Sequence, residues 1–146
     1  MKLKQLSLFL ENRPGALSRP VKLLSKHHIN IITLSIADTQ QFGILRFILR
    51  EWEKAKKLLE ADGCVVKTTD VVAIEVNDEP GGLADILTVI EKGGINVEYM
   101  YAFTLKKENK GVLVFRFDDP DRAVQVLTKA KINVITEIEL FRRLDA

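Results

Sequence analysis

The sequence predicts an α+β fold built from two β-α-β-β-α-β units in tandem, each with an antiparallel sheet and helices on one face. The first supporting observation is an internal repeat. Asn-Arg-Pro-Gly-Ala-Leu at residues 12–17 returns 66 positions later as Asp-Glu-Pro-Gly-Gly-Leu at residues 78–83. The second observation is that strand-like and helix-like patterns follow one another in the same order in both halves. A repeat of this length indicates one structural unit used twice.

The repeat extends through each half of the chain. Three residues keep the offset of 66: Lys26, Ile29 and Asn30 match Lys92, Ile95 and Asn96. After two added residues, an offset of 68 relates a second set: Gly43, Leu45, Phe47, Ala55 and Leu59 match Gly111, Leu113, Phe115, Ala123 and Leu127. We therefore predict two domains of about 70 residues, 1–69 and 70–146.

In the first half, four segments are predicted strands: residues 5–10 and 32–36, which alternate in character, and the largely apolar residues 44–49 and 64–66. Two segments carry apolar residues at helical spacing and are predicted helices: residues 17–28 and 53–62. Pro20 lies inside the first of these helices and is predicted to bend it. The polar residues 67–70 are predicted to be a short linker.

The second half repeats this order. The predicted strands are residues 72–76, 97–105, 112–117 and 134–140, and the predicted helices are residues 83–90 and 123–130. This is the ferredoxin-like, or split βαβ, arrangement. Four apolar residues would point away from the helices and predict a covered sheet face: Ile44, Ile48, Val112 and Val114. The cover is either the other half or a separate partner.

Composition excludes several classes of function. The net charge is +2, with 47% hydrophobic and 29% charged residues, which gives no basis for binding nucleic acid or membrane. The segment 110–117 superficially follows the third strand of RNA-recognition domains, but Val112 and Val114 occupy the positions where aromatic residues would stack on bases. No signal peptide or membrane span is evident, so a cytoplasmic protein is expected.

Catalytic chemistry is also poorly supported, so the chain is predicted not to be an enzyme and to need no cofactor or metal. His27 and His28 are adjacent, which alone makes no metal site. Nothing resembles a nucleophile with its base or a phosphate-binding loop. The single cysteine, Cys64, excludes an internal disulfide and is predicted to be a small buried residue on a strand, with a reactive thiol as the lesser alternative.

The repeated Pro-Gly turn is the candidate functional site. Pro14 and Pro80 suit the first position of a helix, and Gly15 and Gly81 allow another molecule to approach the backbone. Six turn amides are then expected to be unpaired donors at a helix start: those of Gly15, Ala16, Leu17, Gly81, Gly82 and Leu83. Such an end favours an anion, and a carboxylate fits it.

Four polar residues flank these turns, and each has a structural alternative. Asn12 and Asp78 precede the turns and could contact a ligand, with Asp78 favouring an ammonium group, or could serve as helix N-caps. Asn30 and Asn96 could orient a small zwitterion or could be left-handed helix C-caps. Spacing alone leaves both interpretations open.

The sequence resembles a known family over residues 10–19, Leu-Glu-Asn-Arg-Pro-Gly-Ala-Leu-Ser-Arg, followed by His-Ile-Asn-Ile at residues 28–31. These motifs resemble an ACT domain, and within that family the chain is most similar to the regulatory small subunit of acetolactate synthase. The resemblance covers essentially the whole chain as two ACT units. It implies that an amino acid binds between neighbouring units. By position, the implied contacts are Asn12, Gly15, Ala16, Leu17 and Asn30 in the first unit and Asp78, Gly81, Gly82, Leu83 and Asn96 in the second.

The resemblance implies an allosteric regulator that binds a free amino acid, forms a homodimer and acts on an enzyme of amino-acid metabolism. An acetolactate synthase-like catalytic subunit is one candidate for that enzyme, although the small subunits carry a different C-terminal domain in place of the second ACT unit. The alternative is a structural scaffold or interaction subunit without a ligand. In the second unit, Tyr99, Tyr101 and Phe103 alternate onto one sheet face, as a ligand wall or as core.

Overall fold

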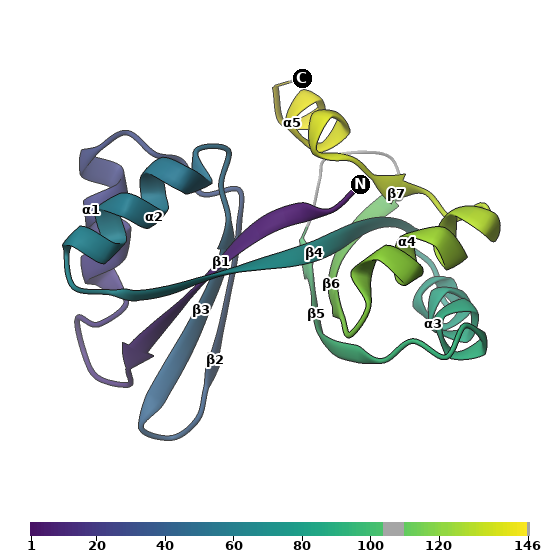
Figure 1. Ribbon diagram of the computed structural model, residues 1–146, viewed down its shortest axis with the longest axis horizontal. Helices are drawn as coiled ribbons and strands as arrows, with labels where there is room; N and C mark the ends of the chain where they lie inside the picture. Colours follow the sequence, from purple (N-terminus) through teal and green to yellow (C-terminus); the bar gives the residue numbers. More distant parts are fainter. Residues whose placement is uncertain (104–109, 146) are drawn as a thin grey trace. The chain divides into compact units, whose positions relative to one another are not determined.

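Each half of the repeat forms a four-stranded sheet with two helices, and the C-terminal half carries a third helix, as a computed structural model of residues 1–103 and 110–145 shows (Figure 1). The chain divides into two compact units. Residues Lys4–Thr69 form the unit that we call N-terminal, and Met1–Leu3 together with the chain from Asp70 onward form the C-terminal unit. The predicted α+β fold class is confirmed, whereas the exact domain bounds of 1–69 and 70–146 stay a prediction.

The N-terminal unit has its strands in the order β2-β3-β1-β4. Its elements are β1 (Leu3–Glu11), α1 (Ser18–Lys26), β2 (Thr33–Asp38), β3 (Phe42–Ile48), α2 (Trp52–Ala61) and the first residues of β4 (Val65–Asn77). Both β1 and β2 pair antiparallel with β3. This is the ferredoxin-like strand order, in which the first and third strands lie at the centre.

The C-terminal unit repeats this order as β5-β6-β4-β7, with antiparallel pairing of β4 with β6 and β7 and of β5 with β6. After β4 its elements are α3 (Gly82–Lys92), β5 (Val97–Phe103), β6 (Lys110–Phe117), α4 (Pro120–Lys129), β7 (Val134–Ile135) and α5 (Glu137–Asp145). The strands β4, β5, β6 and β7 take the places of β1, β2, β3 and β4 in the other unit.

The repeat holds at the level of strand register. In β1 and β3, Leu8 lies opposite Leu45, and in β4 and β6, Ile74 lies opposite Leu113. These pairs are related by the offsets of 66 and 68 found in the sequence. Because side chains alternate between faces with a period of two, identical register places matching residues on matching faces.

Each unit has its own hydrophobic core between sheet and helices. The N-terminal core contains Leu6, Leu8, Leu24, Ile29, Leu45, Phe47, Leu49, Ala55 and Leu59. The C-terminal core contains Val72, Ile74, Ile86, Ile90, Phe115, Phe117, Ala123 and Leu127, among others. Phe115 and Phe117 stack with ring centroids 5.1 Å apart. Full burial of one such side chain stabilises the fold by about 1.5–3 kcal/mol.

We call the sheet face opposite the two helices the open face. The alternation of side chains along each strand determines which residues lie on it. Ile44, Ile48, Val112 and Val114 alternate with core residues and point away from the helices, as predicted. All of them are buried except Ile44, which is half-buried. In β5, Tyr101 and Phe103 lie opposite Val114 and Val112, so Tyr99, Tyr101 and Phe103 share this open face as half-buried residues.

Two local predictions were wrong, those for the linker and for Cys64. Residues 67–70 form no linker, because β4 runs unbroken from Val65 to Asn77; its two threonines are β-branched and suit an extended chain. Pro20 lies in the first turn of α1, which starts at Ser18, and the bend expected there stays a prediction. Cys64 precedes β4 and is half-buried rather than lying on a strand; burial raises the pKa of its thiol, which disfavours the reactive thiolate near neutral pH.

The predicted last strand, residues 134–140, was also wrong beyond its first two residues. Only Val134 and Ile135 form β7, and α5 follows immediately. The Thr136 hydroxyl accepts a hydrogen bond from the backbone N–H of Glu139 (3.2 Å). Thr136 with Glu139 three residues later is therefore the capping-box pattern, which marks the first turn of a helix.

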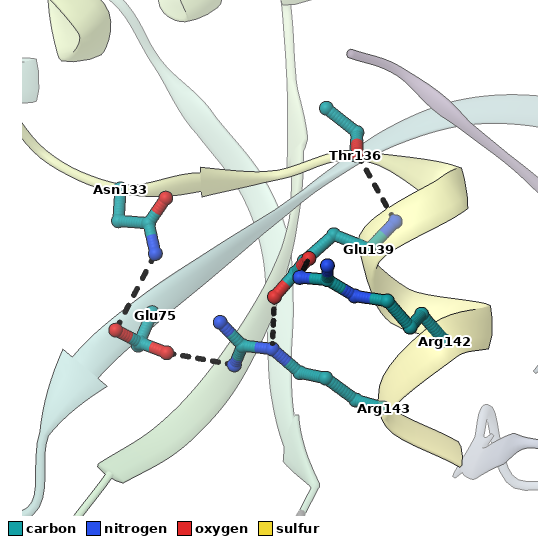
Figure 2. A network of polar contacts seen from close by, with 6 residues as sticks. All are labelled: Glu75, Asn133, Thr136, Glu139, Arg142 and Arg143. Atoms are coloured by element: carbon teal, nitrogen blue, oxygen red, sulfur yellow. Dashed lines mark hydrogen bonds and ion pairs between the residues drawn. The ribbon is translucent and has the colours of Figure 1, made fainter. Parts of the chain in front are cut away.

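Helix α5 is held on the open face of the C-terminal unit by a network of charges (Figure 2). Glu75 of β4 alternates with the core residues Ile74 and Val76 and therefore projects from the open face. Arg143 of α5 contacts Glu75 (Nη1–Oε2, 2.7 Å) and Glu139 (Nε–Oε1, 2.8 Å). The side chains of Arg143 and Glu75 are only 11% and 14% exposed. This pairing fixes α5 against the sheet.

The network predicts a pH dependence of stability. The hydrogen bond from Arg143 lowers the pKa of Glu139 below its usual value of about 4.3. A carboxyl whose pKa is lowered in the folded state stabilises the protein above its unfolded pKa, and this contribution is lost as pH falls through the folded pKa. We expect the difference in unfolding free energy between the wild type and Glu139→Gln to shrink as pH is lowered from about 6 toward 3. Urea denaturation at several pH values measures this; a difference independent of pH would contradict it.

Candidate functional site

The two Pro-Gly turns have the same backbone geometry at their glycines. Gly15 and Gly81 adopt φ values of +86° and +92°, in the left-handed region that disfavours other residues. A Cβ built on either glycine meets nothing within 4 Å. The glycine is therefore required by the backbone and not by packing, and the surface beside each turn is open to another molecule.

The helices begin later than predicted. Helix α1 starts at Ser18 with Leu17 as N-cap, and α3 starts at Gly82 with Gly81 as N-cap. Pro14 and Pro80 therefore precede the helices instead of occupying their first positions. The offset of 66 matches Gly82 with Ala16. Since α3 begins at Gly82 and α1 begins only at Ser18, α3 begins two residues earlier in its repeat than α1 does. A Cβ on Gly82 would lie 2.3 Å from the Asn77 carbonyl oxygen, so only glycine permits this earlier start.

Two of the six turn amides are already paired. The backbone N–H of Ala16 donates to the Arg13 carbonyl (3.2 Å), and that of Gly82 donates to the Glu79 carbonyl (3.1 Å). The prediction that all six would be unpaired was wrong for these two, because each turn closes on itself before its helix begins. Among the described residues, the amides of Gly15, Leu17, Gly81 and Leu83 have no protein acceptor and can donate to a ligand.

The capping alternative is excluded for the four flanking polar residues. Neither N-cap has a side-chain hydrogen bond, so Asn12 and Asp78 cap no helix. The left-handed residues that end the two helices are His28 (φ 57°) and Gly94 (φ 69°), so Asn30 and Asn96 are not left-handed C-caps.

Asn12 has a different structural role. Its side-chain Nδ2 donates to the Gln40 carbonyl (2.9 Å), and its backbone N–H donates to the Gln41 carbonyl (2.9 Å). These bonds tie the end of β1 to the turn between β2 and β3. In the C-terminal unit, Lys110 Nζ donates to Asn77 Oδ1 and joins the end of β4 to the start of β6.

Within one unit, the predicted contacts are not gathered around a single point. The turn and Asn30 lie at opposite ends of α1, whose nine residues span about 14 Å. Asn30 instead lines a shallow cleft of about 440 Å³ with Val21, Ser25 and His28. Asn96 likewise follows α3, where its backbone N–H donates to Asp118 Oδ1 (3.0 Å). One small ligand cannot touch both the turn and the asparagine of the same unit.

The C-terminal turn does open onto a cleft of about 340 Å³. Asp78, Glu79 and Leu83 line it from the turn and α3, and Phe103 and Lys110 line it from β5 and β6. A cleft lined by both carboxylates and an ammonium suits a small zwitterion. Phe103 was predicted only as a possible ligand wall, and Lys110 was missed as a site residue, because only the strand register brings β5 and β6 beside the turn.

The described residues contain no group of three or more His, Cys, Asp and Glu side chains that could hold a metal ion. None of the described helices is long and apolar enough to cross a membrane.

Comparison with known proteins decides the family. Residues 1–144 match the model of the ACT domain pair. The chain belongs to the ACT domain pair family. This match spans both units, in agreement with the internal repeat, and confirms the resemblance seen in the sequence. The ferredoxin-like unit with its Pro-Gly turn is thus an ACT unit, used here twice.

Two relatives share clear sequence similarity with this ACT pair. The acetolactate synthase small subunit of Buchnera aphidicola subsp. Baizongia pistaciae (strain Bp) is 31% identical over 90 residues, which cover 61% of this chain and 57% of that subunit. A solved protein of Bacteroides thetaiotaomicron is 38% identical, with a TM-score of 0.90 over 97% of this chain and 96% of that chain.

The fold is also shared with a more distant structure. The regulatory subunit of aspartate kinase from Thermus thermophilus, in its ligand-free form, has a TM-score of 0.63 and 16% identity. The alignment covers 87% of this chain and 91% of that chain. At this identity the similarity concerns the fold alone.

Proposed function

We propose that this ACT pair is a regulatory protein that binds a free α-amino acid and is not an enzyme. The observation that carries the proposal is the C-terminal cleft, which Asp78, Glu79 and Lys110 line together next to the Pro-Gly turn. The ligand carboxylate would accept hydrogen bonds from the amides of Gly81 and Leu83 and from Lys110. Its ammonium group would lie near Asp78. The cleft volume is near the lower end of the ~300–1,000 Å³ range of ligand pockets and suits a small molecule.

The binding site is completed, in this proposal, by a second ACT unit. Each turn lies beside uncovered apolar side chains: Leu17 (38% exposed) at the first and Leu83 (39%) with Leu87 (37%) at the second. The edge strand β2 also exposes Leu34 and Ile36 on its helix side. An edge strand with exposed apolar residues is suited to pairing with another chain. A homodimer could therefore bring Asn30 or Asn96 of one unit to the turn of its neighbour, since they cannot reach the turn of their own.

The regulated partner is proposed to be an enzyme of amino-acid metabolism in the cytoplasm. An acetolactate synthase-like catalytic subunit is the candidate supported by the Buchnera small subunit, although the match spans only 57% of that protein. A ligand can shift the activity of such a partner only if it binds one arrangement of the ACT units more tightly than another.

A scaffold without a ligand is the second candidate, and one observation favours it. The amides of Ala16 and Gly82 are satisfied within their turns, and the Asn12 side chain is bonded to Gln40. These groups make a stable turn without any bound molecule. The two candidates differ in whether a free amino acid stabilises the folded chain.

A thermal-stability screen with each of the twenty common amino acids separates the two candidates. A ligand that binds only the folded state stabilises it by about 2.7 kcal/mol at a concentration 100-fold above its Kd. We expect at least one amino acid at millimolar concentration to raise Tm. If none raises Tm, the scaffold is the better account.

Substitutions in the C-terminal cleft test the assigned contacts. Asp78→Asn and Lys110→Met are expected to weaken binding about 10- to 150-fold, because the first removes the charge of a proposed acceptor and the second a charged donor, and a hydrogen bond to a charged group is worth about 1.5–3 kcal/mol. Both side chains are at the protein surface, so the unfolding free energy should change little. Asp85→Asn is the matched control, since Asp85 lies in α3, the helix that follows the turn, but does not line this cleft. Equal loss of affinity in Asp85→Asn would contradict the assignment.

A further inference from the structure

The two units differ in how their open faces are covered. In the C-terminal unit, α5 lies against the open face beside Glu75, and the neighbouring Val112 is only 1% exposed. The offsets of the repeat carry Phe9 onto Glu75 and Ile44 onto Val112. Phe9 is nevertheless 47% exposed, and Ile44 is half-buried. The same place on the N-terminal sheet therefore lacks the helix that its counterpart has.

The uncovered residues form one continuous apolar surface. Phe9 lies opposite Ile44, and Ala37 lies opposite Ile44 on its other side. Phe42 starts β3, lies opposite Glu11 and is 53% exposed. Because Phe9, Ala37, Phe42 and Ile44 project from the same sheet face, we call them the open-face patch. Two half-exposed phenylalanines at diagonal positions of one strand pair are typical of an interaction surface.

The chain itself carries a surface that complements this patch. Ile138, on the outer side of α5, is 82% exposed, the largest exposure of any large apolar side chain among the described residues. Arg142 follows four residues later on the same helix face, and its side chain is 73% exposed. On β1, Phe9 is followed two residues later by Glu11, on the same face and 65% exposed. The strand thus carries an apolar and an acidic side chain, and the helix carries an apolar and a basic side chain at a similar spacing, so the two surfaces are complementary in charge.

We propose that the open-face patch binds the outer side of α5 from a second copy of this chain, with Ile138 against Phe9 and Phe42 and Arg142 beside Glu11. The position is the one that α5 covers in the C-terminal unit, so the shape of the sheet there already accommodates a helix. The local partners of the two charges, Arg13 for Glu11 and Glu139 for Arg142, form exposed pairs that are weak and can be exchanged. This contact is separate from the proposed pairing at β2, because Leu34 and Ile36 point to the opposite side of the sheet.

Charge reversal tests the proposed contact in the full-length protein. Sedimentation velocity over a wide concentration range gives the dissociation constant of each association step. Glu11→Lys and Arg142→Glu should each weaken one step at least 10-fold. The double variant, which exchanges the two charges, should restore that step to within about threefold of the wild type. Glu60→Lys and Lys129→Glu, exposed reversals on α2 and α4, should leave it unchanged.

An apolar arm of the same experiment does not depend on charge. Phe42→Ser and Ile138→Ser should weaken the same step while the circular dichroism spectrum stays that of the wild type, since both side chains are already exposed. A chain that stays monomeric at all concentrations would overturn the proposal. It would equally be overturned if no step responds to the single variants, or if the double charge variant is as weak as the singles.

Discussion

Arg143→Met is expected to lower the free energy of unfolding by about 3 kcal/mol. Glu75 is 14% exposed and is held by Arg143 at 2.7 Å. Removing the guanidinium leaves that carboxylate largely buried without its cation, and breaking one partner of a buried ion pair typically costs ~3–5 kcal/mol. Because both side chains keep some contact with water, we expect a loss of unfolding free energy at the lower end of this range. Urea denaturation of both proteins at neutral pH measures it.

The control for this prediction lies one residue away on the same helix. Arg142 is 73% exposed, and Arg142→Met is expected to cost less than about 1 kcal/mol. Replacing Glu75 and Arg143 together by leucine should recover most of the loss, because no charge is then left unpaired. Equal losses for Arg142→Met and Arg143→Met would show that the network does not hold α5 on the sheet.

Gly82→Val is expected to have a comparable effect, about 3 kcal/mol, together with loss of ligand binding at the C-terminal turn. A Cβ at this position would lie 2.3 Å from the Asn77 carbonyl oxygen, which is backbone and cannot move aside cheaply. The chain can relieve the clash only by starting α3 later, as α1 does after Ala16. That change would move the Gly81 and Leu83 amides away from the cleft.

Substitutions at two other glycines distinguish the effect of the steric clash at Gly82 from the effect of backbone strain. Gly63 and Gly81 have φ values of +88° and +92°, and a Cβ on either meets nothing within 4 Å. Alanine at these positions should therefore cost only the left-handed backbone penalty, about 1–2 kcal/mol. Urea denaturation of all three variants tests the ranking. A Gly82→Val protein as stable as Gly63→Ala would contradict it.

Much of the fold could be predicted because the repeat fixes register as well as element order. Leu8 with Leu45 and Ile74 with Leu113 are paired across strands, in keeping with the offsets of 66 and 68. Helix α5 was missed because Val134, Thr136, Ile138 and Leu140 alternate as a strand would. The local capping pair of Thr136 and Glu139 and the long-range contact of Arg143 with Glu75 prevail over that pattern.

The candidate site was predictable to a smaller extent. The glycines of the turns could be identified because a Pro-Gly sequence requires an unusual backbone, and their φ values of +86° and +92° agree. The hydrogen-bond partners of the turn amides could not be identified from the sequence. Bonds such as the one from the Gly82 N–H to the Glu79 carbonyl depend on where the helix begins. Lys110 was missed, and Phe103 could not be assigned between ligand wall and core, because both approach the turn only through the pairing of β4, β5 and β6.

Isothermal titration calorimetry of the full-length chain, with each amino acid that raises Tm and with glycine as a minimal zwitterion, tests the central claim most directly. The account predicts saturable binding with Kd between micromolar and millimolar, about −4 to −8 kcal/mol, for at least one amino acid. It also predicts that Asp78→Asn weakens this binding while Asp85→Asn does not. Absence of saturable heat for every amino acid at millimolar concentration, with the wild-type chain folded, would contradict the claim that this ACT pair is an amino-acid sensor.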